Sequence, residues 1–128
     1  GLPGDDQETI KKTYDLSVEL CTSGWNTYPA MALPGSALYK EGLKNGIEMP
    51  KSYSGYSFHA YDTICLPTNK LKPWEILKLR DDAFISYHLN PKFLDRIKNR
   101  FGYKAVENIK QMSKIKLTRK IVEENSNV

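Results

Sequence analysis

The segment WNTYPAMAL (25–33) limits the fold of this chain more than any other part of the sequence. It is rich in aromatic and small residues and lies between Gly24 and Pro34, which is typical of a short strand buried on both faces. Pro29 stands inside it and lacks a backbone N–H, which favours an edge strand or a bulge. Because one strand cannot form a sheet, we expect this segment to require further strands.

Helical patterns flank this segment on both sides. Asp5 or Asp6 can cap a first helix, whose apolar residues recur at steps of three and four as far as Cys21. After the segment, SALYKEGLKNG (36–46) predicts a helix of two or three turns that a glycine closes. Residues 1–46 therefore predict a helix–strand–helix unit from an alternating α/β pattern.

The rest of the chain divides into a connector and a helical region. Residues 47–68 predict an extended, aromatic-rich connector with strand character around 58–65. Residues 69–128 predict three successive helices. The last of them, over 103–125, follows a break at Gly102 and is expected to be continuous.

The composition suits a soluble globular protein, with 40% hydrophobic and 27% charged residues in a chain of 128. One domain with a single core is expected at this length. No apolar run approaches the roughly 20 residues of a membrane-spanning helix, and no signal-peptide pattern opens the chain. Cys21 and Cys65 are too few for a disulfide scaffold or a self-contained zinc site. We therefore expect a cytoplasmic protein.

The net charge of +4 is unevenly distributed along the sequence. Residues 1–50 hold four Lys/Arg and seven Asp/Glu, a balance of −3, and residues 70–128 hold fourteen and seven, a balance of +7. A basic region of this kind permits binding to nucleic acid, and it also fits a solvated helical surface. One hypothesis is therefore a small basic helical module that binds nucleic acid or a protein partner without catalysis. Its nucleic-acid contacts would come from Lys110, Lys114, Arg119 and Lys120 on the last helix.

Three stretches of the sequence stand in a distinctive order: GLPGDDQETI, WNTYPAMALPGSALY and YDTICLPTNKLKPWEILKLRDDAFISYHLNPKFL. This succession resembles the carboxyl-terminal part of radical S-adenosylmethionine enzymes, especially those with an amino-terminal cobalamin-binding domain. In that family a G-L-P-G-[DE] turn follows the fifth strand of a partial TIM-like barrel. The sixth strand ends in a P-G-[ST]-x-L-Y turn. The likeness covers nearly the whole chain; it is closest in residues 1–46, looser in 60–94 and weakest beyond Gly102.

The resemblance implies a fold and a function. The fold would be α/β and mostly helical: the helix–strand–helix end of the barrel, then the connector and a helical tail. The parent protein would be an iron–sulfur oxidoreductase or methyltransferase that cleaves S-adenosylmethionine reductively to start radical chemistry. Members with the cobalamin domain use it for methyl transfer.

The resemblance also implies a binding site. In the family, the GLPG turn and the backbone of the sixth strand line the pocket for the adenosine part of S-adenosylmethionine. Backbone groups and apolar surface suit a nucleobase, which needs shape and a few hydrogen bonds. The same residues also fit a purely structural role, in which they form the turns between elements. The implied cofactor-binding residues are Leu2, Pro3, Gly4, Tyr28, Ala30, Met31, Ala32 and Leu33.

One departure from the family sets the expected role of this chain. Radical enzymes hold a 4Fe–4S cluster on a C-x-x-x-C-x-x-C loop, and Cys21 and Cys65 fit no such spacing. The resemblance therefore implies an inactive fragment, which itself holds no cofactor and contributes no catalytic residue. Its partners would be the rest of the parent chain, an unknown small-molecule substrate and, through an exposed strand edge, a further copy.

Other groupings of residues give weaker evidence for a functional site. His59 and His88 could bind a metal with Cys65 or Asp62, but no compact ligand spacing is present, and we predict no metal site.

Two groupings of neighbouring residues have structural explanations. Asp81 and Asp82 are neighbours on a helix and do not face each other, whereas Lys78 is spaced to pair with Asp82. The aromatic cluster around Tyr53, Tyr56 and Tyr61 could cover a flat ligand or pack the helical tail, and packing is favoured.

Overall fold

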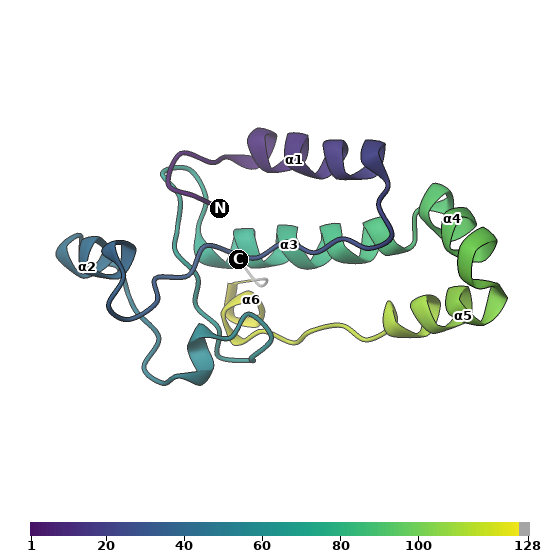
Figure 1. Cartoon of the computed structure of the whole chain (residues 1–128). Coiled ribbons are helices and arrows are strands. Elements are labelled where there is room, and N and C mark those ends of the chain that lie inside the picture. The colour runs from purple at the N-terminus through teal and green to yellow at the C-terminus, as the bar shows by residue number, and fades with distance from the viewer. Residues whose placement is uncertain (126–128) are drawn as a thin grey trace.

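The computed structural model describes residues 1–125, and all regular structure in that part of the chain is helical (Figure 1). Helix caps explain most of the boundaries. The elements are α1 (Gln7–Leu20), α2 (Ala37–Lys44), the 3-10 turn η1 (Ser54–Tyr56), α3 (Pro73–His88), α4 (Pro91–Phe101), α5 (Tyr103–Met112) and α6 (Lys120–Asn125).

The helix boundaries predicted from local signals are confirmed at several ends. Asp6 caps α1: its Oδ1 accepts from the backbone N–H of Thr9 at 2.9 Å, while the Thr9 hydroxyl accepts from the N–H of Asp6 at 3.0 Å. Pro73 and Pro91 stand at the first positions of α3 and α4, where a missing N–H costs nothing. Gly102 separates α4 from α5 with a positive φ of 81°.

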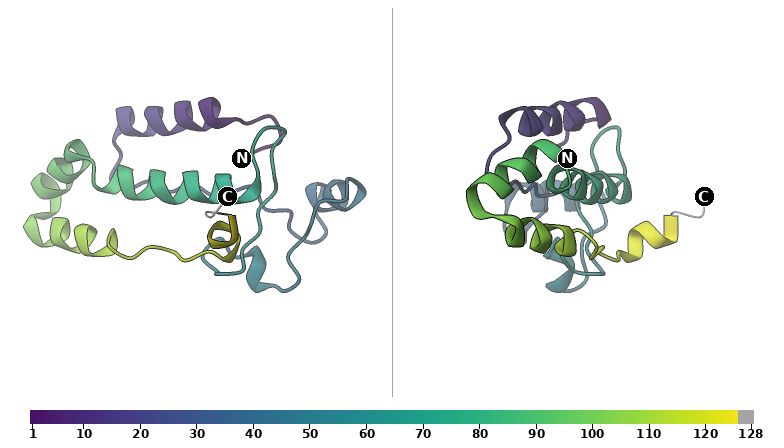
Figure 2. Two further views of the ribbon diagram at one scale, coloured as in Figure 1. Left: turned by 180° about the vertical axis from the view of Figure 1, so that it is seen from behind. Right: turned by 90° about the vertical axis from the view of Figure 1, so that its right-hand side faces the viewer.

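Helix α3 is the central element, and a hydrophobic cluster surrounds each of its ends. Figures 1 and 2 show α1 lying along one side of α3, with α4 and α5 at its carboxyl end and α2 projecting at its amino end. The carboxyl-end cluster has buried Cys21, Tyr87, Phe93, Ile97 and Val106. The amino-end cluster has buried Cys65, Leu71, Ile76 and Leu77, with Ile121 and Val122 of α6 packed against it.

The predicted α/β fold is wrong. Residues 25–33 are extended, but in the described part of the chain they form no strand. The strand character expected around 58–65 is also absent there, because residues 58–62 form turns. The segment 25–33 runs back along α3, antiparallel to it (Figure 1). Within residues 1–125, one backbone hydrogen bond, from the N–H of Leu66 to the carbonyl of Ala30 at 2.9 Å, joins it to another extended stretch. Pro29 removes one donor, and one bond does not make a ladder.

The single helix predicted over 103–125 is also wrong. The chain leaves α5 after Met112, turns at Ser113 and Lys114, and has no helix over 115–119 before α6 begins at Lys120. Five residues span up to roughly 17 Å when extended and about 8 Å as a helix. The extended form lets the chain return along α3 and place Arg119 beside Asp81.

Among residues 1–125, no helix combines the length and the apolar character that crossing a bilayer would require.

Candidate functional site

The amino-terminal GLPGD turn is held by its own hydrogen bonds. The N–H of Leu2 donates to Oδ2 of Asp5 at 2.8 Å, and the N–H of Asp5 donates to the carbonyl of Leu2 at 2.8 Å. These contacts, led by the Leu2 N–H, hold the pKa of the Asp5 carboxyl below its usual range. The carbonyl of Pro3 accepts from the N–H of Asn69 at 3.0 Å, which ties the turn to the connector.

The extended segment 25–33 is covered by helices on one side and exposed on the other. Trp25 packs into the carboxyl-end cluster and Met31 against the amino-end cluster, and Pro29 is buried. The side chain of Tyr28 is 64% exposed. In an extended chain successive side chains point to opposite faces, which fits exposed Tyr28 beside buried Pro29, whereas Ala30 and Met31 are both partly buried and Ala32 is buried.

The backbone of this segment keeps a row of unused donors. Within residues 1–125, the N–H groups of Tyr28, Ala30, Met31 and Ala32 have no hydrogen-bond partner. Unpaired backbone donors that water does not reach are costly, so proteins normally pair them. Such donors point along the edges of an extended segment, and here the neighbouring stretch at Leu66 leaves them unpaired, so a further extended chain could pair with them.

Of the eight predicted cofactor-binding residues, Tyr28 is the one that lines the cavity where the turn and the segment meet. The turn and the segment meet at a cavity of about 110 Å³ lined by Gly1, Asp5, Tyr28 and Pro29, among others. Ligand pockets usually measure about 300–1,000 Å³, so this cavity is smaller than a nucleoside pocket. The remaining predicted residues divide between surface and core. Leu2, Pro3, Gly4 and Leu33 are exposed, Ala32 is buried, and Ala30 and Met31 are partly buried.

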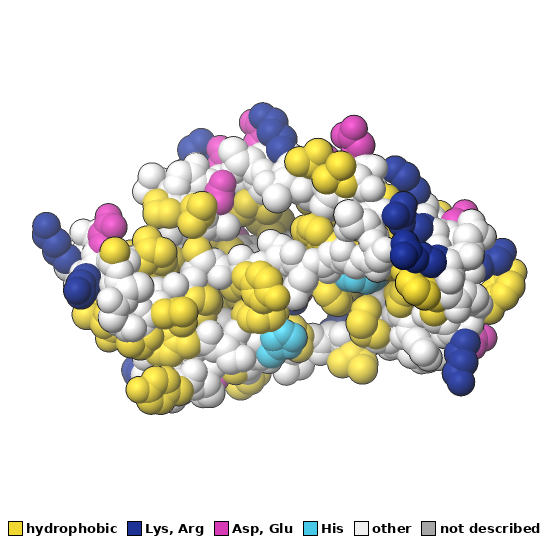
Figure 3. All heavy atoms as spheres, in the orientation of Figure 1, with side chains coloured by type: hydrophobic (Ala, Val, Ile, Leu, Met, Phe, Trp, Pro, Cys, Tyr) yellow, Lys and Arg dark blue, Asp and Glu magenta, His cyan; other side chains and the backbone are white. Residues whose placement is uncertain are grey.

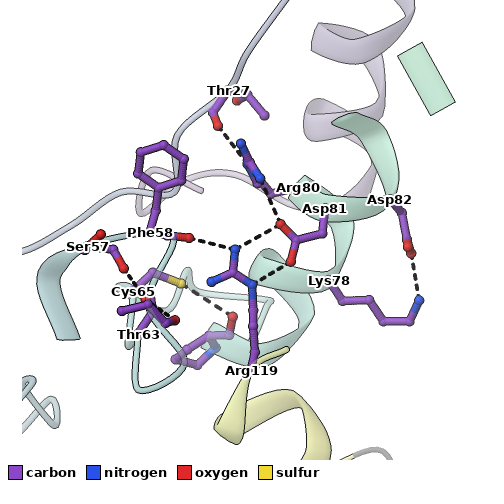
Figure 4. A network of polar contacts seen from close by, with 12 residues as sticks. Thr27, Ser57, Phe58, Thr63, Cys65, Lys78, Arg80, Asp81, Asp82 and Arg119 are labelled. Carbon is purple, nitrogen blue, oxygen red and sulfur yellow. Dashed lines mark hydrogen bonds and ion pairs between the residues drawn. The ribbon is translucent and has the colours of Figure 1, made fainter. Parts of the chain in front are cut away.

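Beneath the segment lies a buried network of charged side chains (Figure 4). Arg119 donates to both oxygens of Asp81, through Nε at 2.5 Å and Nη2 at 2.9 Å, and Nη2 also donates to the carbonyl of Phe58 at 2.8 Å. Arg80 donates to Oδ1 of Asp81 at 3.0 Å and to the carbonyl of Thr27 at 3.1 Å. The network fixes the segment, the connector and the start of α6 to α3.

Sequence reasoning missed this network. Arg119 was predicted as a surface cation for nucleic acid, but its side chain is 1% exposed and paired with Asp81, and Lys110 lies on a different helix from Lys120. The four predicted nucleic-acid contacts therefore do not share one helix face. A signal was present for Arg80, because it follows Ile76 by four residues on the core side of α3.

The aromatic connector packs mainly against the rest of the chain. The ring of Phe58 meets Tyr28 edge-on at 4.8 Å between centroids and His59 at 4.0 Å. The hydroxyl of Tyr61 donates to Glu123 of α6 at 2.8 Å, which agrees with a role in packing the tail. Tyr53 is 90% exposed.

The face along which the segment runs is largely hydrophobic. Figure 3 shows hydrophobic side chains gathered over its left and central parts, with most Lys and Arg side chains along its upper and outer borders. The predicted Lys78–Asp82 pair is confirmed at 2.7 Å. Like other exposed pairs, it contributes little to stability.

The two cysteines cannot act together. Cys21 belongs to the carboxyl-end cluster and Cys65 to the amino-end cluster. Burial raises the pKa of the Cys65 thiol to about 12, which makes it a poor ligand and a poor nucleophile at neutral pH. Among residues 1–125, no group of three His, Cys, Asp or Glu side chains is arranged to hold a metal ion.

Comparison with known proteins gives no relative: no family model, no curated protein and no solved structure matches the chain.

Proposed function

We propose that this chain is the carboxyl-terminal part of a radical S-adenosylmethionine enzyme. One observation carries the proposal: the segment 25–33 has helices on one side and unused backbone donors along its length. Such an edge fits a segment that pairs with other parts of a larger protein. The order of the GLPGD turn, the segment and the LPGS turn in the sequence supports the same assignment.

In this proposal the chain contributes a wall to the adenosine site and no catalytic residue. The GLPGD turn is already rigid, and the open side of the segment presents Tyr28 with backbone N–H and C=O groups. The backbone groups suit hydrogen bonds to the edges of a nucleobase, and the Tyr28 ring suits stacking on its face. The 110 Å³ cavity between them would have to be enlarged by walls from the rest of the parent protein.

The cysteines of this chain do not fit a 4Fe–4S cluster, because they are buried in separate clusters. The cluster ligands would lie elsewhere in the parent protein. There the cluster would supply the electron that cleaves S-adenosylmethionine. The isolated chain is therefore expected to be inactive.

The coding sequence upstream of Gly1 tests this proposal. We expect codons for C-x-x-x-C-x-x-C roughly 120–170 residues earlier, the span of most of a one-domain barrel. A start codon immediately upstream of Gly1 would contradict the proposal.

A biochemical test follows from the same assignment. The full-length parent, reconstituted without oxygen and reduced with dithionite, should release 5′-deoxyadenosine from S-adenosylmethionine. The parent without these 128 residues should release at least about a hundredfold less, since misplaced substrate groups cost rates of this order. Equal release by both proteins would exclude a role for this chain in the adenosine site.

A further inference from the structure

A second pocket shares Arg80 with the cavity described above. It has a volume of about 270 Å³ and lies between α3 and the extended connection from α5 to α6. Phe84, Met112 and Ile115 contribute apolar wall, and Ile115 is 75% exposed at its rim. Arg80, Asp81 and Asn26 contribute polar groups, and both oxygens of the Asp81 carboxylate are already hydrogen-bonded. An apolar pocket with a few polar groups is the usual form of a small-molecule site.

The charges around this pocket do not balance. Asp81 is paired through both carboxylate oxygens with Arg119, whose guanidinium lies behind it. Arg80 shares only one of these oxygens, and its other hydrogen bonds go to neutral acceptors, the carbonyl of Thr27 and Oδ1 of Asn26. Two buried guanidinium groups thus meet one carboxylate, and the excess positive charge belongs to Arg80 at the pocket wall.

The polar groups at this wall that remain free are mostly hydrogen-bond donors. Oδ1 of Asn26 accepts from Arg80 at 2.7 Å, which leaves its amide NH₂ unused among the described residues. The exposed ring of His59 also lines the pocket and makes no hydrogen bond there. The rings of Phe58 and Phe84 lie at 5.0 Å from the Arg80 guanidinium and fix its position.

The geometry points to a binding site for a small anion with an apolar body, such as an aromatic carboxylate. Its ring would lie against Phe84 and Ile115, and its carboxylate would face Arg80 and the Asn26 amide. A buried, incompletely compensated guanidinium binds a carboxylate more strongly than an exposed one does. This site goes beyond the proposed function and does not depend on it, since the pocket is complete within this chain.

Titration of the ¹⁵N-labelled chain with two ligands that share one ring system tests the site. Naphthalene-2-carboxylate should shift the amide signals of Phe84, Ile115 and Leu117. It should bind at least about tenfold more tightly than naphthalene-2-methanol, which lacks the charge. Equal binding of the two ligands, shifts confined to other regions, or no binding up to about 10 mM would each overturn the inference.

Two pairs of variants separate charge from shape. Asn26→Asp keeps the oxygen that Arg80 needs and adds a negative charge, so binding of the carboxylate should fall about tenfold while that of the alcohol changes less than about threefold. Asn45→Asp, at the exposed carboxyl end of the distant α2, should change the affinity for neither ligand. Ile115→Ala should weaken the binding of both ligands equally, and Leu43→Ala on α2 should change neither affinity. A carboxylate affinity unaffected by Asn26→Asp would contradict the role of Arg80.

Discussion

At the residue scale, Arg119 does more than any other side chain to hold the carboxyl-terminal region in place. Its guanidinium is almost completely buried and reaches Asp81 on α3 and the carbonyl of Phe58 in the connector. Its Nη1 has no hydrogen-bond partner among residues 1–125. A buried ion pair of this kind adds little net stability, but removing Arg119 leaves Oδ2 of Asp81 and the carbonyl of Phe58 without a donor, while Arg80 still pairs with Oδ1.

Arg119→Met should therefore lower the free energy of unfolding by roughly 2–5 kcal/mol, because two buried acceptors lose their donor. Urea denaturation followed by circular dichroism measures the change. Lys116→Met, on the exposed connection three residues away, is the control and should change it by less than about 0.5 kcal/mol. A loss below about 1 kcal/mol in Arg119→Met would show that the guanidinium is not buried with Asp81.

Asp6 provides a pH-dependent contact at the start of α1. Its hydrogen bond with Lys70, followed by the N–H of Thr9, lowers the pKa of its carboxyl from 3.8 to about 2. A carboxyl with a lowered pKa stabilises the folded state above its ordinary pKa, and the contribution disappears as the pH falls through the lowered value. This contact should therefore weaken between about pH 4 and pH 2.

The carboxyl carbon of Asp6, followed by NMR against pH, should titrate near 2 and move upward in Lys70→Met. Lys11→Met removes an exposed pair with Asp15 and should leave the Asp6 titration unchanged. An identical Asp6 titration in Lys70→Met and the unaltered chain would show that Lys70 makes no contact with it.

At the element scale, Gly102 sets the angle between α4 and α5. Its φ of 81° and ψ of 177° lie in a region that is open almost only to glycine. Gly102→Ala should destabilise the protein by about 1–3 kcal/mol, although an added Cβ meets no atom within 4 Å. The cost would come from backbone conformation alone.

Gly24→Ala gives the matched control, because its added Cβ also meets no atom within 4 Å and its φ is not positive. It should leave the unfolding midpoint unchanged or raise it slightly, since alanine reduces the entropy of the unfolded chain. If both variants lose the same stability, then Gly102 does not require its positive φ.

Helix ends could be predicted from the sequence because capping depends on neighbours within a few residues. Asp6, Pro73, Pro91 and Gly102 all act locally. The break after Met112 could not be predicted in this way, because it depends on Arg119 reaching Asp81, thirty-eight positions away in sequence. Helix propensity was overridden there by a tertiary contact.

At the scale of the whole molecule, the predicted site is the part that local signals describe least well. The sequence predicted a strand over 25–33, which is wrong: the segment is extended but forms no strand, because pairing depends on which chains lie beside it, and a sequence pattern does not specify that. Tyr28 is exposed as a pocket wall requires, whereas Ala32 is buried by contacts that only the folded chain reveals. The open side of 25–33 and the hydrophobic face around it (Figure 3) are the features that the proposed parent protein would cover.

Amide hydrogen exchange in the isolated chain tests the unpaired edge most directly. The amides of Tyr28, Ala30, Met31 and Ala32 should exchange within about tenfold of the rate of an unfolded peptide, while the amides of Leu77 and nearby residues in α3 are far more protected. In the full-length parent, the four edge amides should gain protection of about a hundredfold or more. Protection of the edge in the isolated chain equal to that of α3 would contradict the account, because those donors would then already be paired.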